Sequence, residues 1–387
     1  AYNYQYAQKD PGAFAHNPKY VIEFLYDSLK NLDDHPQVTV PNMGAMFRND
    51  SGHFDAGAYA FRRWDRPQDD ISGGAIDRGT VDASCARCHS PGGFDFWQEY
   101  GIDLPTEAEV GDGFRCEQCH VEDADYLGTP EVKYVDKVLF PGGVELTNDP
   151  GNPDTSFLCM SCHIGRVGMA DIESKIAGAT GGMSFSNVHY LPAGATLYGD
   201  DADVGVEYAG KLYTGKWDHF APGGASQCQF CHLEDHTFKP QAAPSCAACH
   251  TGIPLEEYRL NRAADSDGNP ATTTLKAEMA AYESALLTAI EAYATAVIGQ
   301  GIQYGSGYPY FFNAPGPASG YSNGYRDFDG PLLRAAHNYQ FAHKDPGAWA
   351  HNTHYAMQLL YDSIEDLELA MRAAPGTYLG TLTRPAP

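Results

Sequence analysis

All ten cysteines of this 387-residue chain occur in five copies of the pattern Cys-x-x-Cys-His. In such a pattern the two thiols form thioether bonds to the vinyl groups of a haem, and the following histidine becomes an axial iron ligand. The alternatives are structural zinc, an iron–sulfur cluster and disulfides, but zinc does not require histidine directly after the second cysteine and disulfides require none. We therefore expect five covalently bound c-type haems. The attachment cysteines and proximal histidines are Cys85, Cys88 and His89; Cys116, Cys119 and His120; Cys159, Cys162 and His163; Cys228, Cys231 and His232; and Cys246, Cys249 and His250.

A haem that only transfers electrons is best served by two strong axial ligands, because a saturated iron changes oxidation state with little rearrangement. Ten histidines remain outside the five motifs, and five of them should face iron. His236 is the strongest single candidate because it follows His232 by four residues and precedes Cys246 by ten, so that it is already held between two haems.

The composition limits the class of partner. The chain carries a formal net charge of −25, and its sequence pI is about 4.8. Such a field repels nucleic acid and anionic membrane surfaces and favours cationic partners. No run of 18 or more apolar residues occurs, so the sequence predicts no membrane span. Because covalent haem attachment takes place outside the cytoplasmic membrane, and because Ala1-Tyr2 opens neither a basic nor an apolar stretch, we expect an exported, mature protein. It should be extracellular or on the cell surface, with the periplasm as the alternative.

One element of the sequence occurs twice. Residues 2–32, here called the N-terminal block, align without gaps on residues 337–367, the C-terminal block, with 18 of 31 positions identical. Each block contains a Lys-Asp-Pro-Gly turn and then Ala-His-Asn at the start of an amphipathic segment. Asn17 and Asn352 are expected as helix N-caps, and Pro18 suits the first helical position. The pattern therefore holds His16 and His351 at equivalent places, at the beginning of a helix.

The rest of the chain predicts a mainly α protein with extensive irregular loops, because it is rich in Gly (41) and Pro (25) and has few long periodic stretches. With about 77 residues for each haem (387/5), the haems should form much of the core. Apolar spacing predicts one long helix over residues 275–298, which Gly299 ends. Residues 304–333 are expected to form an ordered surface loop, or else a docking surface for another subunit. The expected division is a ligand-bearing element at 1–40, a five-haem core at 41–334 and a second ligand-bearing element at 335–387.

Several further motifs occur along the chain: Gly52-His-Phe-Asp, Ala60-Phe-Arg-Arg-Trp, Ser84-Cys-Ala-Arg-Cys-His-Ser, Leu158-Cys-Met-Ser-Cys-His, Asn187-Val-His-Tyr, Ala193-Gly-Ala-Thr-Leu, Glu207-Tyr-Ala-Gly-Lys-Leu-Tyr, His236-Thr-Phe and the terminal block. Together they resemble one family, the modular multihaem c-type cytochromes of dissimilatory metal-reducing bacteria, which include filament-forming outer-surface cytochromes. The resemblance covers most of residues 50–385. It implies that the distal iron ligands are His53, His189, His219, His236 and the histidine of the Ala-His-Asn block, which is His351 or His16.

These features predict a carrier that passes electrons from haem to haem, with no catalytic residue and no substrate turned over. Its partners would be other redox proteins or extracellular electron acceptors. Because the Ala-His-Asn block occurs twice, one histidine is surplus in a single molecule, which raises the hypothesis of a head-to-tail homopolymer, a conductive filament. Two alternatives stay open: a multihaem reductase of the pentahaem nitrite reductase type, disfavoured because all five motifs end in histidine rather than lysine, and a monomeric periplasmic electron shuttle.

Overall fold

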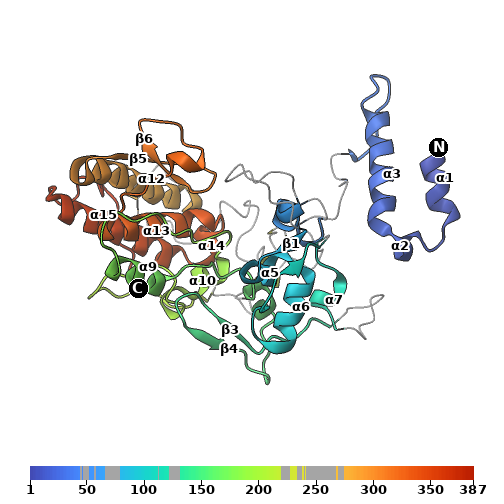
Figure 1. Ribbon diagram of the computed structural model, residues 1–387, viewed down its shortest axis with the longest axis horizontal. Coiled ribbons are helices and arrows are strands. Elements are labelled where there is room, and N and C mark those ends of the chain that lie inside the picture. Colours follow the sequence, from blue (N-terminus) through green and yellow to red (C-terminus); the bar gives the residue numbers. More distant parts are fainter. Residues whose placement is uncertain are drawn as a thin grey trace. The chain divides into compact units, whose positions relative to one another are not determined.

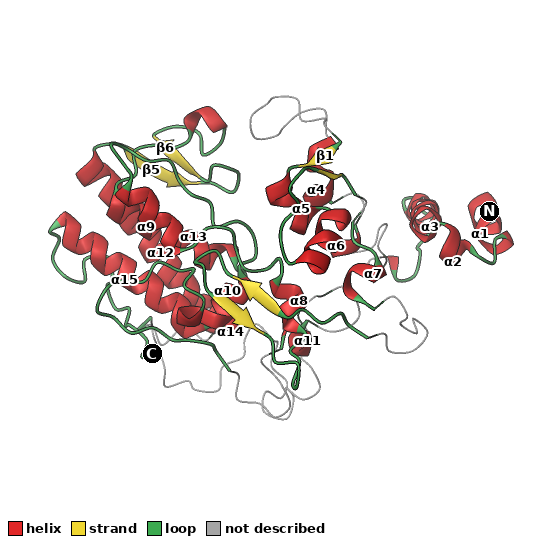
Figure 2. Ribbon diagram, turned by 60° about the horizontal axis from the view of Figure 1, so that its bottom comes forward, coloured by secondary structure: helices red, strands yellow, loops and turns green. Residues whose placement is uncertain are grey.

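The computed structural model describes residues 1–43, 46, 52–55, 58–65, 79–111, 113–121, 131–218, 227–232, 238, 240, 267–268 and 274–387. These residues form two compact units. The first contains the described residues up to Lys133 together with Phe238, and the second contains the others from Tyr134 to Pro387. In both units helices are joined by irregular segments, and the strands are short (Figures 1 and 2).

The first unit begins with three helices, α1 (Tyr2–Lys9), α2 (Ala13–His16) and α3 (Pro18–Asp33). The Asn17 side chain accepts a hydrogen bond from the Tyr20 amide at 3.1 Å, and a proline stands in the first turn, so the predicted start of α3 is confirmed. Tyr6 of α1 and Phe24 of α3 pack edge to face with ring centroids 5.3 Å apart. This contact holds α1 and α3 side by side, as Figure 1 shows.

The remainder of the first unit is built around the first two cysteine motifs. Trp64, Val81, Ala86 and Ala108 form a small buried cluster. Gly93 lies so close to Ala86 that a Cβ at position 93 would come within 2.3 Å of the Ala86 carbonyl oxygen, and this close approach packs α6 against α5. The elements are the 3₁₀ turns η2 (Gly52–Phe54) and η3 (Arg63–Asp65), the helices α4 (Tyr59–Arg62), α5 (Ala83–His89), α6 (Pro91–Tyr100) and α7 (Cys116–Cys119), and the antiparallel strands β1 (Thr80–Val81) and β2 (Ala108–Glu109).

The second unit has a helical core in which α12, α13 and α15 pack against one another (Figure 1). Its shorter helices are α8 (Ser156–Met160), α9 (Met169–Ala177), α10 (Ala193–Tyr198), α11 (Cys228–Cys231) and α14 (Ala348–His351); its longer ones are α12 (Leu275–Tyr293), α13 (Gly330–Lys344) and α15 (Thr353–Met371). Two antiparallel hairpins, β3 (Lys137–Leu139) with β4 (Glu145–Thr147) and β5 (Gly301–Tyr304) with β6 (Phe311–Ala314), accompany the turns η4 (Gly199–Asp201) and η8 (Tyr321–Asn323).

The predicted long helix is confirmed in its extent. α12 ends at Tyr293 and continues as a π-helical turn, η7 (Ala294–Ile298), until Gly299 adopts a left-handed conformation with φ of 85°. Its buried side chains recur at helical spacing and face α13 and α15. Burying each large apolar side chain contributes about 1.5–3 kcal/mol to the free energy of folding. The buried residues of these three helices include Tyr282, Leu286, Ile290, Leu332, Leu360 and Ile364. The mainly α fold class with many loops is therefore confirmed.

One prediction of local structure was wrong in part. Residues 304–333 are not only a surface loop: they include strand β6, which pairs with β5, and they supply buried aromatic side chains to the helical core. Phe311 and Phe328 are fully buried and pack edge to face, with ring centroids 5.7 Å apart. The many Gly and Pro residues concealed this role, because the aromatic residues between them do not follow a simple period.

Candidate haem-binding sites

The first motif lies on α5, where the histidine ring is held by a backbone contact. His89 Nδ1 lies 2.8 Å from the Ala60 carbonyl oxygen, and the Trp64 ring packs on the imidazole with centroids 5.3 Å apart. A hydrogen bond from Nδ1 fixes the ring and leaves Nε2 as the nitrogen that can bind a metal. This arrangement is the one that an axial haem ligand requires.

The second motif lies on α7, which a buried glutamine anchors. The Gln118 side chain accepts a hydrogen bond from the Arg115 amide at 2.7 Å and donates to the Asp95 carboxylate at 2.9 Å. His120 Nδ1 lies 3.3 Å from a backbone carbonyl oxygen, as in the first motif. Burial raises the pKa of the Cys119 thiol to about 11, which indicates a protected, apolar setting for the attachment cysteine.

The third and fourth motifs lie next to each other, on α8 and α11 (Figure 2). The Ser156 hydroxyl accepts a hydrogen bond from the Cys228 amide at 2.9 Å. The Cys159 thiol contacts the Cys228 thiol, and this contact is the main cause that lowers the pKa of Cys228 to about 7. Two haems attached at these cysteines would therefore have neighbouring edges.

The proximal histidine of the fourth motif faces a distal candidate. The imidazole rings of His232 and His351 lie with centroids 6.3 Å apart and planes at 33°. Two imidazole nitrogens that bind one metal at about 2 Å lie about 4 Å apart, and each ring centroid is about 1 Å further out, which requires roughly 6 Å between centroids. The observed separation therefore fits an iron held by both rings, although the two histidines are far apart in the sequence.

A buried carboxylate orients His351. Its Nδ1 lies 2.8 Å from Asp345 Oδ2, and the Asp345 side chain is only 1 % exposed. Burial acts against both charges, but the attraction between the two groups prevails, so the pKa of His351 is raised and that of Asp345 is lowered. A carboxylate on the outer nitrogen makes an imidazole ligand more electron-rich than a carbonyl does. Sequence reasoning missed Asp345 and read it as part of a turn, although the six-residue spacing from Asp to His recurs in both blocks.

The N-terminal block reproduces this geometry at His16. His16 Nδ1 lies 2.9 Å from Asp10 Oδ2, and Asp10 accepts a hydrogen bond from the Gly12 amide at 3.0 Å, the same distance at which Asp345 accepts from Gly347. The surroundings differ, because the His16 side chain is 70 % exposed and that of His351 is 24 % exposed. The N-terminal block thus holds His16 in the same local geometry as His351, but at the surface.

Two other predicted distal ligands are described. His53 lies on η2 in the first unit, and its ring packs against Phe114 and Phe238 at 6.2 and 5.4 Å between centroids. Burial lowers the pKa of His53, which favours the neutral imidazole that metals bind. In the second unit, His189 comes two residues after Asn187. The Asn187 side chain accepts a hydrogen bond from the His189 backbone amide at 3.0 Å. The other predicted residues, His219, His236, Cys246, Cys249 and His250, lie outside the described residues.

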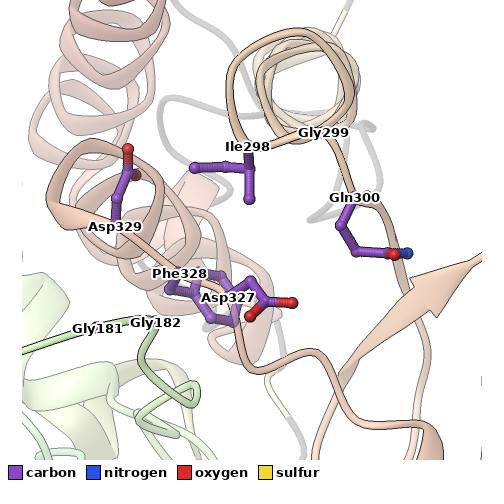
Figure 3. Close-up of a pocket in the computed structure, with 8 residues that line it drawn as sticks. All are labelled: Gly181, Gly182, Ile298, Gly299, Gln300, Asp327, Phe328 and Asp329. Carbon is purple, nitrogen blue, oxygen red and sulfur yellow. The ribbon is translucent and has the colours of Figure 1, made fainter.

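Histidines outside the predicted ligand set have contacts of other kinds. His337 is fully buried, and its Nε2 lies 2.9 Å from the Val204 carbonyl oxygen. His343 Nδ1 pairs with Glu283 at 2.9 Å. Among the described residues, no predicted haem residue lines the hollow of about 370 Å³ shown in Figure 3, which lies between a glycine pair, the end of η7 and Asp327–Asp329.

The residues present fit covalently bound haem. The eight described cysteines form no disulfide, so their thiols are available for attachment. No helix among the described residues combines the length and apolar character needed to cross a lipid bilayer.

Comparison with known proteins identifies relatives among polyheme cytochromes. The chain is 28 % identical over 351 residues to the C-type polyheme cytochrome OmcB of Geobacter sulfurreducens, covering 73 % of this chain and 43 % of OmcB. It is also 28 % identical over 301 residues to the C-type polyheme cytochrome OmcC of the same organism, covering 65 % of this chain and 36 % of OmcC. The chain thus spans less than half the length of these relatives. No family model and no solved structure matches. The resemblance to the multihaem c-type cytochromes of metal-reducing bacteria is confirmed.

Proposed function

We propose that this chain is a five-haem c-type cytochrome that carries electrons from haem to haem and catalyses no reaction of its own. The single observation that carries the proposal is the opposition of His232 and His351 at 6.3 Å between ring centroids. Imidazoles on both sides of one iron leave no coordination position for a substrate, which favours electron transfer over catalysis.

When bound, each haem supplies a reversible one-electron redox centre, and the protein determines its position and its potential. His232 and His351 would hold the fourth haem, and Asp345 fixes the His351 ring. The contact of Cys159 with Cys228 brings the third and fourth attachment sites together, which is the proximity that electron transfer between them needs. For the other four haems we propose His53, His189, His219 and His236 as distal ligands, within a core at residues 41–334.

We further propose an exported location, outside the cell or on its surface, and redox proteins or extracellular acceptors as partners. The acidic composition, with a net charge of −25, supports cationic partners or metal ions. Because His351 faces a haem motif of its own chain, His16 is the ligand left to act on a neighbouring haem unit. A head-to-tail filament of this chain would require His16 of one copy to take the place of His351 in the next copy.

A measurement of haem content and spin state tests the proposal. The purified protein should carry five covalent haems by mass, and its reduced spectrum should show the sharp alpha band of low-spin haem. Added cyanide or nitrite should leave the spectrum of the protein unchanged. A persistent high-spin signal, or binding of either anion, would favour the reductase alternative. Imaging of His16→Ala and His351→Ala proteins tests the filament. If His16 joins the copies, the His16→Ala protein should not assemble, and normal assembly of both proteins would rule out ligand exchange between copies.

A further inference from the structure

The two blocks differ most in how their apolar side chains are covered. Tyr339, Phe341 and Tyr355 of the C-terminal block are at most 5 % exposed. The equivalent side chains of the N-terminal block, Tyr4, Tyr6 and Tyr20, are 62 %, 47 % and 55 % exposed. A face with the composition of a protein core therefore lies open on α1 and α3, and such faces mark interaction sites.

The polar residues that attach the C-terminal block to its unit are retained as well. Asn338 accepts a hydrogen bond from the Val206 amide at 2.7 Å and donates to the Val206 carbonyl oxygen at 2.8 Å. Gln340 accepts from the Val188 amide at 3.0 Å. Their equivalents are Asn3 and Gln5. Amides placed to bind an extended backbone are needed at an interface and not at a solvated surface.

Two charged residues of the C-terminal block also have partners within their unit and are retained in the N-terminal block. Asp362 is buried and pairs with Lys211 and Arg384 at 2.6 and 2.9 Å. Lys344 lies between the rings of Tyr190 and Tyr310, with its ammonium nitrogen 3.7 and 3.9 Å from their centroids. The N-terminal block keeps both charges: Asp27 is the equivalent of Asp362, and Lys9 is the equivalent of Lys344. Both side chains are exposed. The partner surface should therefore offer a cation and an aromatic pair.

The N-terminal block already has the conformation needed to dock. Asn3 donates to the Ser28 hydroxyl at 2.8 Å, as Asn338 does to Ser363 at 3.0 Å, and each serine donates to a carbonyl oxygen one turn earlier at 2.7 Å. A preorganised surface loses little conformational entropy on binding.

A second copy of this chain is a poor match for the N-terminal block, since its own C-terminal block fills the corresponding site. Leu359 lies 2.3 Å from the position that a Cβ on Gly205 would take, so the larger Phe24, its equivalent, has no room there. Lys30 replaces Glu365, whose carboxylate pairs with Lys211, so that two cations would meet.

We propose that the N-terminal block docks on a different haem-bearing unit that lacks its own closing helices, and that His16 supplies the second axial ligand of one haem there. The receiving unit presents an extended backbone segment for Asn3 and Gln5, a cation for Asp27 and aromatic rings for Lys9. The ligand role of His16 rests on the proposed haem function, whereas the docking of α1 and α3 follows from the face itself.

Site-specific cross-linking of the full, haem-loaded chain tests this inference. A photoreactive phenylalanine analogue is placed at Tyr6, inside the face, or at Gln8, whose equivalent His343 is exposed, in cells that export their own c-type cytochromes. The expected adduct from position 6 joins a peptide of another haem protein next to a Cys-x-x-Cys-His motif, and position 8 yields at least tenfold less. Asp27→Lys should reduce the adduct at least tenfold, whereas Gln8→Lys, which changes the charge at the position equivalent to the exposed His343, should preserve the adduct from position 6.

Three results would overturn the docking: an adduct with a second copy of this chain, an adduct with a protein that has no haem motif, or equal yields from positions 6 and 8. The haem content of the same purified chain separates this outcome from failure of the proposed function. Five low-spin haems without the adduct refute only the docking, and the adduct with fewer than five haems refutes only the function.

Discussion

Replacing Asp345 by Asn should raise the reduction potential of one haem and leave the other four unchanged. The carboxylate contacts His351 Nδ1 at 2.8 Å, and a metal bound at Nε2 at about 2 Å lies roughly 6–7 Å from that charge. The negative charge favours ferric over ferrous iron, because the ferric form carries one more positive charge. At an effective dielectric constant of about 20, two unit charges at this distance interact by about 2.5 kcal/mol. For a one-electron couple this corresponds to about 100 mV.

The assay is a spectroelectrochemical titration of the holoprotein, resolved into five one-electron steps. Asn has the same shape as Asp and can still accept the hydrogen bond of the Gly347 amide, so the fold should be kept. The chain offers a matched control in Asp10→Asn, which removes the equivalent carboxylate beside the exposed His16 and should shift no haem of the isolated chain. A shift below about 30 mV in the Asp345 variant, or an equal shift in the control, would refute the assigned role.

Three further changes have expected outcomes. His351→Ala should convert one haem of five to a high-spin form that binds cyanide, while His343→Ala leaves the spectrum unchanged, and equal spectra for the two variants would contradict the ligand assignment. Glu207→Gln tests a pH dependence: burial and the neighbouring Asp200 raise the pKa of Glu207 to about 8, so its contribution to stability is fully present at low pH and is lost as the pH rises from about 4.5 through 8. In denaturant titrations over this pH range, the free energy of unfolding of the wild type should fall by about 2 kcal/mol more than that of the variant, after allowance for solvent screening. Parallel curves for the two proteins would contradict the raised pKa of Glu207. Asp362→Ala should destabilise the protein by about 3 kcal/mol because Lys211 and Arg384 lose their buried partner, and a loss below about 1 kcal/mol would show that the pair is unimportant.

The sequence predicted the features that depend on local pattern. The five haem motifs are defined by adjacent residues, Asn17 and Asn352 cap helices as their local context indicates, and helix α12 follows from the spacing of its apolar side chains. Each of these signals lies within one or two helical turns. Physical chemistry that acts over a few residues can be read without knowing the fold.

Features that depend on long-range contacts could not be predicted in the same way. The opposition of His232 and His351 requires α11 and α14 to meet, which no spacing in the sequence specifies. Asp345 gains its role only because it is buried next to His351, and strand β6 forms because Phe311 packs into a helical core contributed by other segments. The repeated block shows the same limit: 18 identical positions could not reveal that one copy is buried and the other exposed.

We propose above all that His232 and His351 hold one haem iron from opposite sides within a single chain. A density map of the haem-loaded protein tests it most directly. We predict five haems, with one iron between these two imidazoles and with the haems attached at Cys159 and Cys228 as neighbours. A map in which His232 and His351 bind different irons, or in which fewer than five haems are attached, would contradict it.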